Sequence, residues 1–167
     1  MPPELELSDA GVPAAERVDI LRAVSAEVLE TMFFTEALDT ECEHDWLPGA
    51  VWARIAFSGS HCGHMLLGLS GEVATSIASG FLGLDCAETG EQERAQVILE
   101  LANILCGAVL SRLWPESRLL LDAPEMGGWE GGLDGSLHGC LALPEGMLAV
   151  SIRMCAPSEP PDSGRGN

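Results

Sequence analysis

The residues of this chain that are best placed to do chemistry are Glu100 and Asn103, which lie in a long apolar segment from residue 91 to residue 114. Five residues of that segment share one side of a helix: Gln96, Glu100, Asn103, Gly107 and Ser111. A helix advances about 100° per residue, so these positions fall within an arc of roughly 80°. The remaining positions are mostly apolar and predict a helix that is buried over most of its circumference. The polar stripe thus offers a carboxylate and a carboxamide on a rigid scaffold, with Gly107 leaving the backbone below them accessible.

The chemistry open to this pair is limited. A carboxylate accepts a proton or pairs with a cation, whereas an amide both donates to and accepts from the same water. Asparagine is no general base, so its natural role is to orient a water or an oxyanion. No Ser, Cys or His lies beside the pair to act as a nucleophile. The alternative is an ordinary amphipathic helix that shows its polar face to solvent, and the pattern alone leaves both interpretations open.

The composition excludes several classes of function. The chain has 167 residues, which suits one domain with a substantial core, and a formal net charge of -18. Nucleic acid and anionic membranes would both be repelled by that charge. The absence of lysine and tyrosine removes Walker-type phosphate binding, Schiff-base chemistry and tyrosine general acids. We expect no membrane span, no signal peptide and therefore a cytoplasmic location.

Cysteine and histidine residues suggest a metal site as a second possibility. The six cysteines form no C-x-x-C pair, and in a cytoplasmic chain we expect most of them to be reduced and buried. The residues that two nearby loops could offer to zinc are Cys42, His44, His61, Cys62 and His64. Their spacing matches no common zinc module, so we expect no metal site.

The elements that must position the polar stripe are helices and short strands. Helical spacing predicts helices over residues 15–38, 71–82 and 91–114. Strand and turn patterns predict a hairpin of 51–57 with 64–69, a strand over 118–122, and a hairpin of 136–143 with 147–154. An acidic loop spans residues 36–45, and we expect flexible tails over 1–14 and 156–167 around one domain over 15–155. This order predicts the α+β class, with helices packed on one face of an antiparallel sheet.

Five features in order resemble a known family. They are Glu-Val-Leu-Glu-Thr-Met-Phe-Phe in the first helix, Gly59-x3-Gly63 in the first hairpin, the helix over 70–82, Glu100-x2-Asn103 with Gly107 one turn on, and Pro124. Together they resemble the CheX branch of the CheC/CheX/FliY chemotaxis phosphatases. The resemblance implies the CheC/CheX-like fold, with the E-x2-N site on its long central helix. The first helix has Glu27-Val-Leu-Glu30 without an asparagine, so the resemblance implies a single site.

The family resemblance also implies a function. Its members hydrolyse the aspartyl phosphate of a CheY-type receiver domain, with Mg²⁺ supplied by the receiver rather than by a cofactor of their own. Carried onto this chain, Glu100 would dock to the receiver's lysine and Asn103 would orient the attacking water. Gln96, Gly107 and Ser111 would contact the partner. The resemblance further implies a homodimer, and the alternative is a module of the same fold that binds a receiver without turnover.

Overall fold

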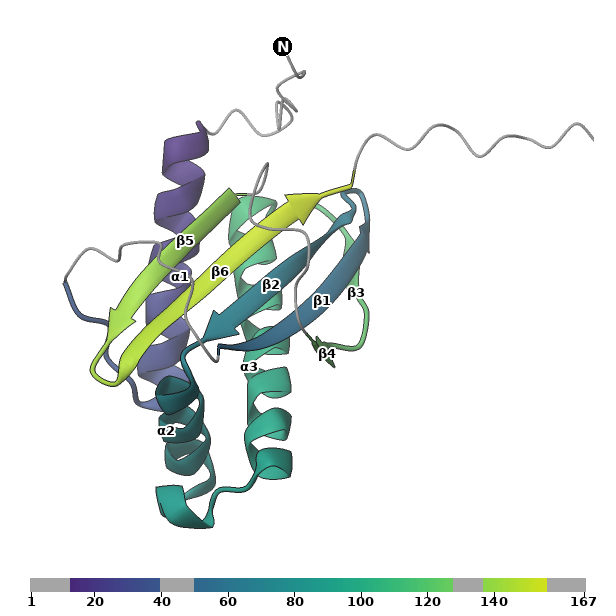
Figure 1. Cartoon of the computed structure of the whole chain (residues 1–167). Coiled ribbons are helices and arrows are strands. Elements are labelled where there is room, and N and C mark those ends of the chain that lie inside the picture. The colour runs from purple at the N-terminus through teal and green to yellow at the C-terminus, as the bar shows by residue number, and fades with distance from the viewer. Residues whose placement is uncertain (1–12, 40–49, 128–136, 156–167) are drawn as a thin grey trace, which may run out of the picture.

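An antiparallel sheet forms the centre of the computed structural model, which describes residues 13–39, 50–127 and 137–155 (Figure 1). Its strands are β1 (Val51–Gly59), β2 (Gly63–Leu69), β3 (Leu119–Leu121), β4 (Glu125–Met126), β5 (Leu137–Leu143) and β6 (Gly146–Met154). They are ordered β3-β1-β2-β6-β5, and β4 also pairs with β1. Both predicted hairpins are confirmed, since β1 pairs with β2 and β5 with β6.

Helices cover one face of this sheet. They are α1 (Ala14–Phe33), α2 (Gly71–Leu82) and α3 (Glu91–Leu113), with a 3₁₀ turn η1 (Cys86–Glu88) before α3. Figure 1 shows α1 and α3 running side by side behind the strands, with α2 below the sheet beside the first turns of α3. The predicted α+β architecture is confirmed.

The buried face of α3 ties the helices to the sheet. Its buried positions recur in adjacent pairs every four residues: Val97, Ile98, Leu101, Ala102, Leu105, Cys106, Val109, Leu110 and Leu113. This spacing makes a continuous apolar stripe, which contacts α1, α2 and the strands β1 and β2. Leu101 and Leu105 are fully buried, so truncating either to alanine would cost roughly 2–5 kcal/mol of stability.

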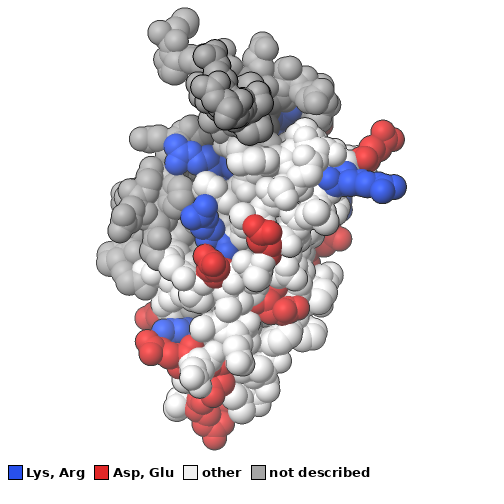
Figure 2. All heavy atoms as spheres, turned by 90° about the vertical axis from the view of Figure 1, so that its right-hand side faces the viewer, with Lys and Arg blue, Asp and Glu red and all other residues white. Residues whose placement is uncertain are grey.

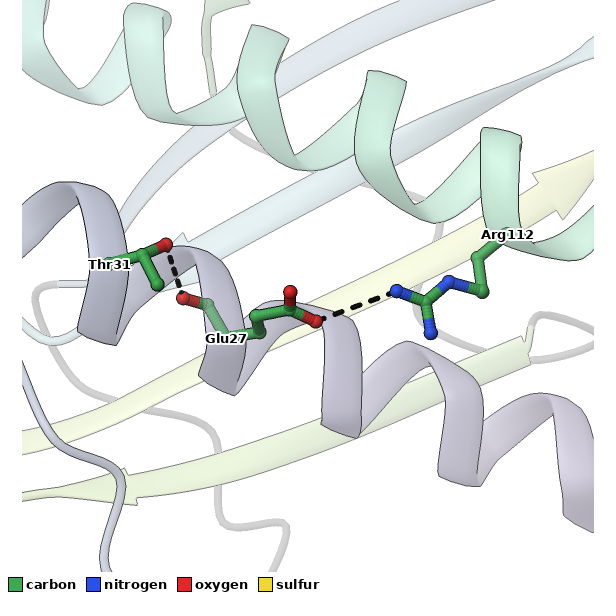
Figure 3. Close-up of polar contacts among 3 residues, drawn as sticks. All are labelled: Glu27, Thr31 and Arg112. Carbon is green, nitrogen blue, oxygen red and sulfur yellow. Dashed lines mark hydrogen bonds and ion pairs between the residues drawn. The ribbon is translucent and has the colours of Figure 1, made fainter.

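An exposed ion pair adds a polar contact between α1 and α3. Nη2 of Arg112 lies 3.5 Å from Oε2 of Glu27, and Oγ1 of Thr31 donates a hydrogen bond to the Glu27 carbonyl (Figure 3). Both charged side chains are more than half exposed, which limits such a pair to about 1 kcal/mol or less. Glu27 therefore has a local partner on the neighbouring helix.

One helix is long and apolar enough to bear on the expectation that the chain has no membrane span. Among the described residues, α3 has the length and apolar composition to cross a bilayer, with a mean hydropathy of 1.5 over 18 residues. Half of that window is buried inside the domain, as expected for the core helix of a soluble fold, which passes the same test. This feature is weak evidence for a membrane span.

The first helix ends earlier than its sequence pattern predicts. It stops at Phe33 rather than at residue 38, because Phe34 takes a left-handed conformation with φ 55°. The N–H of Thr35 then donates to the carbonyl of Leu29, which closes the helix end. The chain continues to Leu38, whose N–H donates to the carbonyl of Ala142 in β5. Glycine is the usual sign of such an end, and its absence explains the wrong boundary.

Two of the cysteines also differ from expectation. Cys62 and Cys155 form a disulfide bond that links the β1–β2 turn to the end of β6. The expectation that most cysteines are reduced and buried holds for Cys106 and Cys140, whereas Cys86 is free but exposed. Sequence spacing gave no sign of the pairing, because these two cysteines are 93 residues apart.

Candidate functional site

The polar stripe of α3 lies on its open face. Gln96, Glu100, Asn103 and Ser111 are exposed, and Gly107 is half-buried. The structure thus places all five residues away from the apolar stripe that packs on the sheet. The neighbouring Leu99, Ile104 and Ala108 are half-buried, so α3 is less enclosed than the sequence pattern predicts.

Only part of the stripe lines a groove. Gln96, Leu99, Glu100 and Asn103 form one wall, and residues Leu121 to Pro124 form the other, around an open volume of about 380 Å³. Glu100 and Asn103 are thereby brought together with a segment that lies about 20 residues further along the chain. The groove is open to solvent and accessible to a protruding group of another molecule.

The second wall is held in place by the edge of the sheet. β3 pairs with β1, with Leu121 opposite Phe57, and the N–H of Asp122 donates to the carbonyl of Ala56 at 2.9 Å. β4 pairs with β1 two residues further on, with Glu125 opposite Arg54. Hydrogen bonds on both sides of residues 122–124 therefore fix this wall beside α3.

The groove carries negative charge. Glu100 and Asp122 are both exposed and line it, and no Arg is among its described lining residues. Figure 2 shows the face of the molecule that carries β3 and the β1 edge, where acidic side chains also gather at the lower end. Such a groove favours a cationic group from a partner. The Asn103 amide beside the two carboxylates supplies both a donor and an acceptor.

Asp122 is the charged groove residue that sequence reasoning missed. Its segment was predicted as the end of a strand, and only the pairing of that strand with β1 brings it to α3. Strand order was not readable from the sequence. Pro124, which carried part of the family resemblance, lies in the same wall and was the available sign.

The other two stripe residues line a separate hollow. Gly107 and Ser111 lie further along α3, beside Leu110, Trp114 and β3, around a volume of about 260 Å³. Leu121 borders both the groove and this hollow. The structure therefore divides the five predicted residues between two adjoining depressions.

The alternative metal ligands are not gathered in the described part of the chain. Cys62 is bound to Cys155, and the His61 ring stacks on Trp114 with centroids 4.2 Å apart. Cys42 and His44 lie outside the described residues. No group of three or more His, Cys, Asp or Glu side chains suited to a metal occurs among residues 13–39, 50–127 and 137–155.

Two groups outside the groove have shifted pKa values, the buried Cys106 and the half-buried His64. Burial raises the pKa of the Cys106 thiol to about 12, so this residue stays protonated and acts as packing in α3. Burial, with the nearby charges of Arg54 and Arg153, lowers the pKa of His64 in β2. Neither group is among the residues that line the groove.

Known proteins resemble this chain in the elements that form the groove. The family model described as chemotaxis phosphatase CheX matches residues 51–127, from β1 through β4, and this range contains both walls of the groove. This part of the chain is similar to CheX. No curated protein sequence matches it.

Solved CheX structures share this fold. CheX from Vibrio vulnificus is 20% identical with a TM-score of 0.67, and the match covers 86% of this chain and 99% of that one. CheX from Desulfovibrio desulfuricans is 15% identical with a TM-score of 0.65, covering 84% and 99%. The CheX chain of the CheX–CheY–BeF₃–Mg²⁺ complex from Borrelia burgdorferi is 17% identical with a TM-score of 0.61, covering 84% and 98%. At these identities the likeness establishes the CheX/CheC fold.

Proposed function

We propose that this protein is a phosphatase that hydrolyses the aspartyl phosphate of a CheY-type receiver domain. The observation that carries the proposal is the exposed groove in which Glu100 and Asn103 face Asp122 on a CheX-like fold. The CheX protein from Borrelia burgdorferi, which shares this fold, occurs in a complex with CheY, BeF₃ and Mg²⁺. BeF₃ stands in for the phosphoryl group of the receiver's aspartate.

Glu100 and Asn103 have different roles in this proposal. The exposed Glu100 carboxylate forms an ion pair with a lysine of the receiver, which fixes the position of α3 over the phosphorylated site. Asn103, one helical turn further on, then extends its amide to a water beside the phosphorus atom. The amide holds that water in line with the bond to be broken.

The reaction needs no covalent step on this chain. The water oxygen forms a bond to phosphorus while the bond between phosphorus and the aspartyl oxygen breaks, releasing inorganic phosphate and the aspartate carboxylate. Catalysis of phosphoryl transfer rests on positioning and charge stabilisation. A chain without lysine is suited to this role, because the receiver supplies both the lysine and Mg²⁺.

The test is the decay of phosphorylated receiver with wild-type protein and with Asn103→Ala. We expect the wild type to accelerate the decay and Asn103→Ala to lose roughly 10²- to 10³-fold of that acceleration, as when one preorganised donor is removed from an active site. The dissociation constant of Asn103→Ala for the receiver with beryllium fluoride and Mg²⁺ should stay within about threefold of the wild-type value, because the amide acts mainly on the water.

Glu100→Gln separates docking from chemistry. This variant keeps the shape of the side chain but loses its charge, so we expect the dissociation constant for the receiver to rise about tenfold or more, equivalent to about 1.4 kcal/mol. Arg112→Ala is the control, because Arg112 is an exposed residue of α3 that pairs with α1. This variant should leave the dissociation constant and the acceleration of decay unchanged. Equal loss of binding in Asn103→Ala and Glu100→Gln would contradict the division of roles.

The alternative function is a module that binds a receiver without turnover. It predicts tight binding of the beryllium fluoride form with no acceleration of decay by the wild type. Asn103 is the feature that favours the phosphatase, since an exposed amide beside Glu100 has no use in docking through an ion pair alone.

Two further properties belong to this proposal. The resemblance to CheX implies a homodimer, which sedimentation velocity would test at micromolar concentration. It also implies a cytoplasmic location, where receiver domains act, and fractionation of cells expressing the protein would test that.

A further inference from the structure

The apolar stripe of α2 continues past the end of the hydrophobic core. Its buried apolar positions recur in adjacent pairs every four residues: Val73, Ala74, Ile77 and Ala78. Phe81 and Leu82 are the next pair, and each is 41% exposed, whereas the four buried positions are at most 2% exposed. Helical spacing puts all three pairs on one face. The face of α2 that packs in the core therefore ends in apolar side chains that the fold leaves uncovered.

The first helix also ends in exposed apolar side chains, beside the same face of α2. Met32 is 45% exposed and Phe34 is 83% exposed. The ring of Phe33, which lies buried between them in the chain, stacks on Phe81 with centroids 5.0 Å apart. Phe34 takes the left-handed conformation, with φ 55°, which bulky residues rarely adopt and glycine favours. The fold thus places an exposed aromatic side chain where the backbone conformation favours glycine.

Leu84 extends this surface, and hydrogen bonds fix its position. Its N–H donates to the carbonyl of Ser79 at 3.0 Å, and Oγ of Ser79 and Sγ of Cys86 share a hydrogen bond of 3.3 Å. A Cβ atom added at Gly80 or Gly83 would meet no described atom within 4 Å. The end of α2 is therefore ordered and unpacked. We call its exposed apolar side chains, with those of α1, the apolar end patch: Met32, Phe34, Phe81, Leu82 and Leu84.

Carboxylates flank the apolar end patch along the chain. Residues 30–39 contain three of them and no arginine, and residues 82–94 contain four of them and one arginine. They belong to Glu30, Glu36, Asp39, Asp85, Glu88, Glu91 and Glu93. Figure 2 shows acidic side chains gathered at the lower end of the molecule, where α2 lies in Figure 1. A second copy of the chain would bring like charges together here, whereas a cationic surface is attracted.

We propose that the apolar end patch binds a basic amphipathic helix of a partner protein. An apolar patch rimmed by polar residues is typical of a protein interaction site. An amphipathic helix covers such a surface with side chains at positions i, i+3, i+4 and i+7, and basic residues on its flanks reach the carboxylates. The five patch residues line neither the groove nor the adjoining hollow. This partner therefore binds apart from the receiver, and the inference does not depend on the proposed function.

The test uses two synthetic peptides with the same leucine and lysine composition. The leucines form one face of a helix in the amphipathic peptide and are dispersed in the control peptide. Dissociation constants are measured for the wild type, Phe34→Asn, Phe81→Ser and Leu120→Ser, after thermal unfolding has shown that each variant folds. Asparagine tolerates the left-handed conformation, so Phe34→Asn removes the aromatic ring without straining the chain. Leu120 is the matched control, because it is 72% exposed in β3 and lies outside the patch.

We expect the wild type to bind the amphipathic peptide about tenfold or more tightly than the control peptide. Phe34→Asn and Phe81→Ser should each raise the dissociation constant of the amphipathic peptide about tenfold, as expected for the loss of an aromatic anchor, while Leu120→Ser stays within about twofold. If Phe81→Ser does not fold, Phe34→Asn decides alone. Equal binding of both peptides, or unchanged binding by Phe34→Asn, would overturn the inference. So would a wild type that self-associates without peptide and a Phe34→Asn variant that does not, because a second copy would then cover the patch.

Neutral substitutions test the charge of the partner. Glu30→Gln combined with Glu36→Gln keeps the side-chain shape and removes two exposed carboxylates on either side of Phe34 in the chain. We expect the dissociation constant of the amphipathic peptide to rise about threefold or more at low ionic strength. Glu116→Gln, at an exposed residue beyond the last turn of α3, should leave it unchanged. An unchanged value in the double variant would overturn the choice of a basic partner.

Discussion

At the residue scale, the groove combines few functional groups, and their positions matter more than their reactivity. Glu100 and Asn103 are exposed on one helix, and Asp122 faces them from a wall fixed to the sheet. The proposed reaction requires no nucleophile from these residues, because the water and the receiver supply the bonds that change. Cys106 and His64, whose pKa values are shifted, do not line the groove.

His64 gives a prediction on the pH dependence of stability. Its pKa is lowered in the folded protein by burial and then by Arg54 and Arg153, so the unfolded chain binds the proton more readily. The free energy of unfolding contributed by this residue is therefore fully present above about pH 6.5 and is lost as pH falls toward the folded pKa. The slope cannot exceed about 1.4 kcal/mol per pH unit, which is the limit for one proton.

The measurement compares urea unfolding of the wild type and His64→Gln from pH 8 to pH 5. The difference in stability between the two proteins should be constant above pH 7 and shift in favour of the variant below pH 6.5. His138→Gln, at a histidine of β5, is the control. A difference that stays flat down to pH 5 would show that His64 titrates normally.

At the element scale, helices and hairpins were readable from the sequence, and long-range pairing was not. The helix over 71–82 has the bounds that its spacing predicts, because Gly83 ends it with a left-handed cap. The first helix was predicted too long, because Phe34 takes that conformation without the glycine that marks it. β4, in the Pro- and Gly-containing segment after Pro124, was missed because two residues joined to β1 have no periodicity of their own.

One wall of the candidate site was likewise predictable from the sequence, and the other was not. The stripe on α3 followed from helical geometry alone, since five positions and an angle per residue suffice. The wall of residues 121–124 depends on the pairing of β3 with the edge strand β1, which sequence periodicity does not encode. The sequence therefore predicted half of the groove. The family resemblance, through Pro124, pointed toward the other half.

Gly107 yields a prediction at this scale. Gly107→Ala should raise the free energy of unfolding by about 0.5–1 kcal/mol, because alanine favours the helix and its methyl group reaches only van der Waals contact with Leu121. Chemical denaturation measures the change, with Gly80→Ala in α2 as a glycine control in open space. A loss of stability in Gly107→Ala would mean that the fold itself needs this glycine.

At the scale of the whole molecule, the sheet is built from segments far apart in sequence. β6 pairs with both β2 and β5, so it joins the first hairpin to the last one. The ladder between β2 and β6 extends past the strands, because the N–H of Cys155 donates to the carbonyl of Cys62 at 2.8 Å. The disulfide bond between the same two residues closes this end of the sheet. The described fold therefore has its ends held by a covalent bond as well as by packing.

The disulfide bond gives the last prediction. Reduction with dithiothreitol, or Cys62→Ser, should lower the free energy of unfolding by about 2–4 kcal/mol, because the bond closes a long loop and restricts the unfolded chain. Cys86→Ser is the control, since Cys86 is a free and exposed cysteine, and it should change stability by no more than about 0.5 kcal/mol. Peptide mapping without reductant should recover the peptides of Cys62 and Cys155 joined. Unlinked peptides, or equal stability with and without dithiothreitol, would mean that β6 is held by the ladder and the core alone.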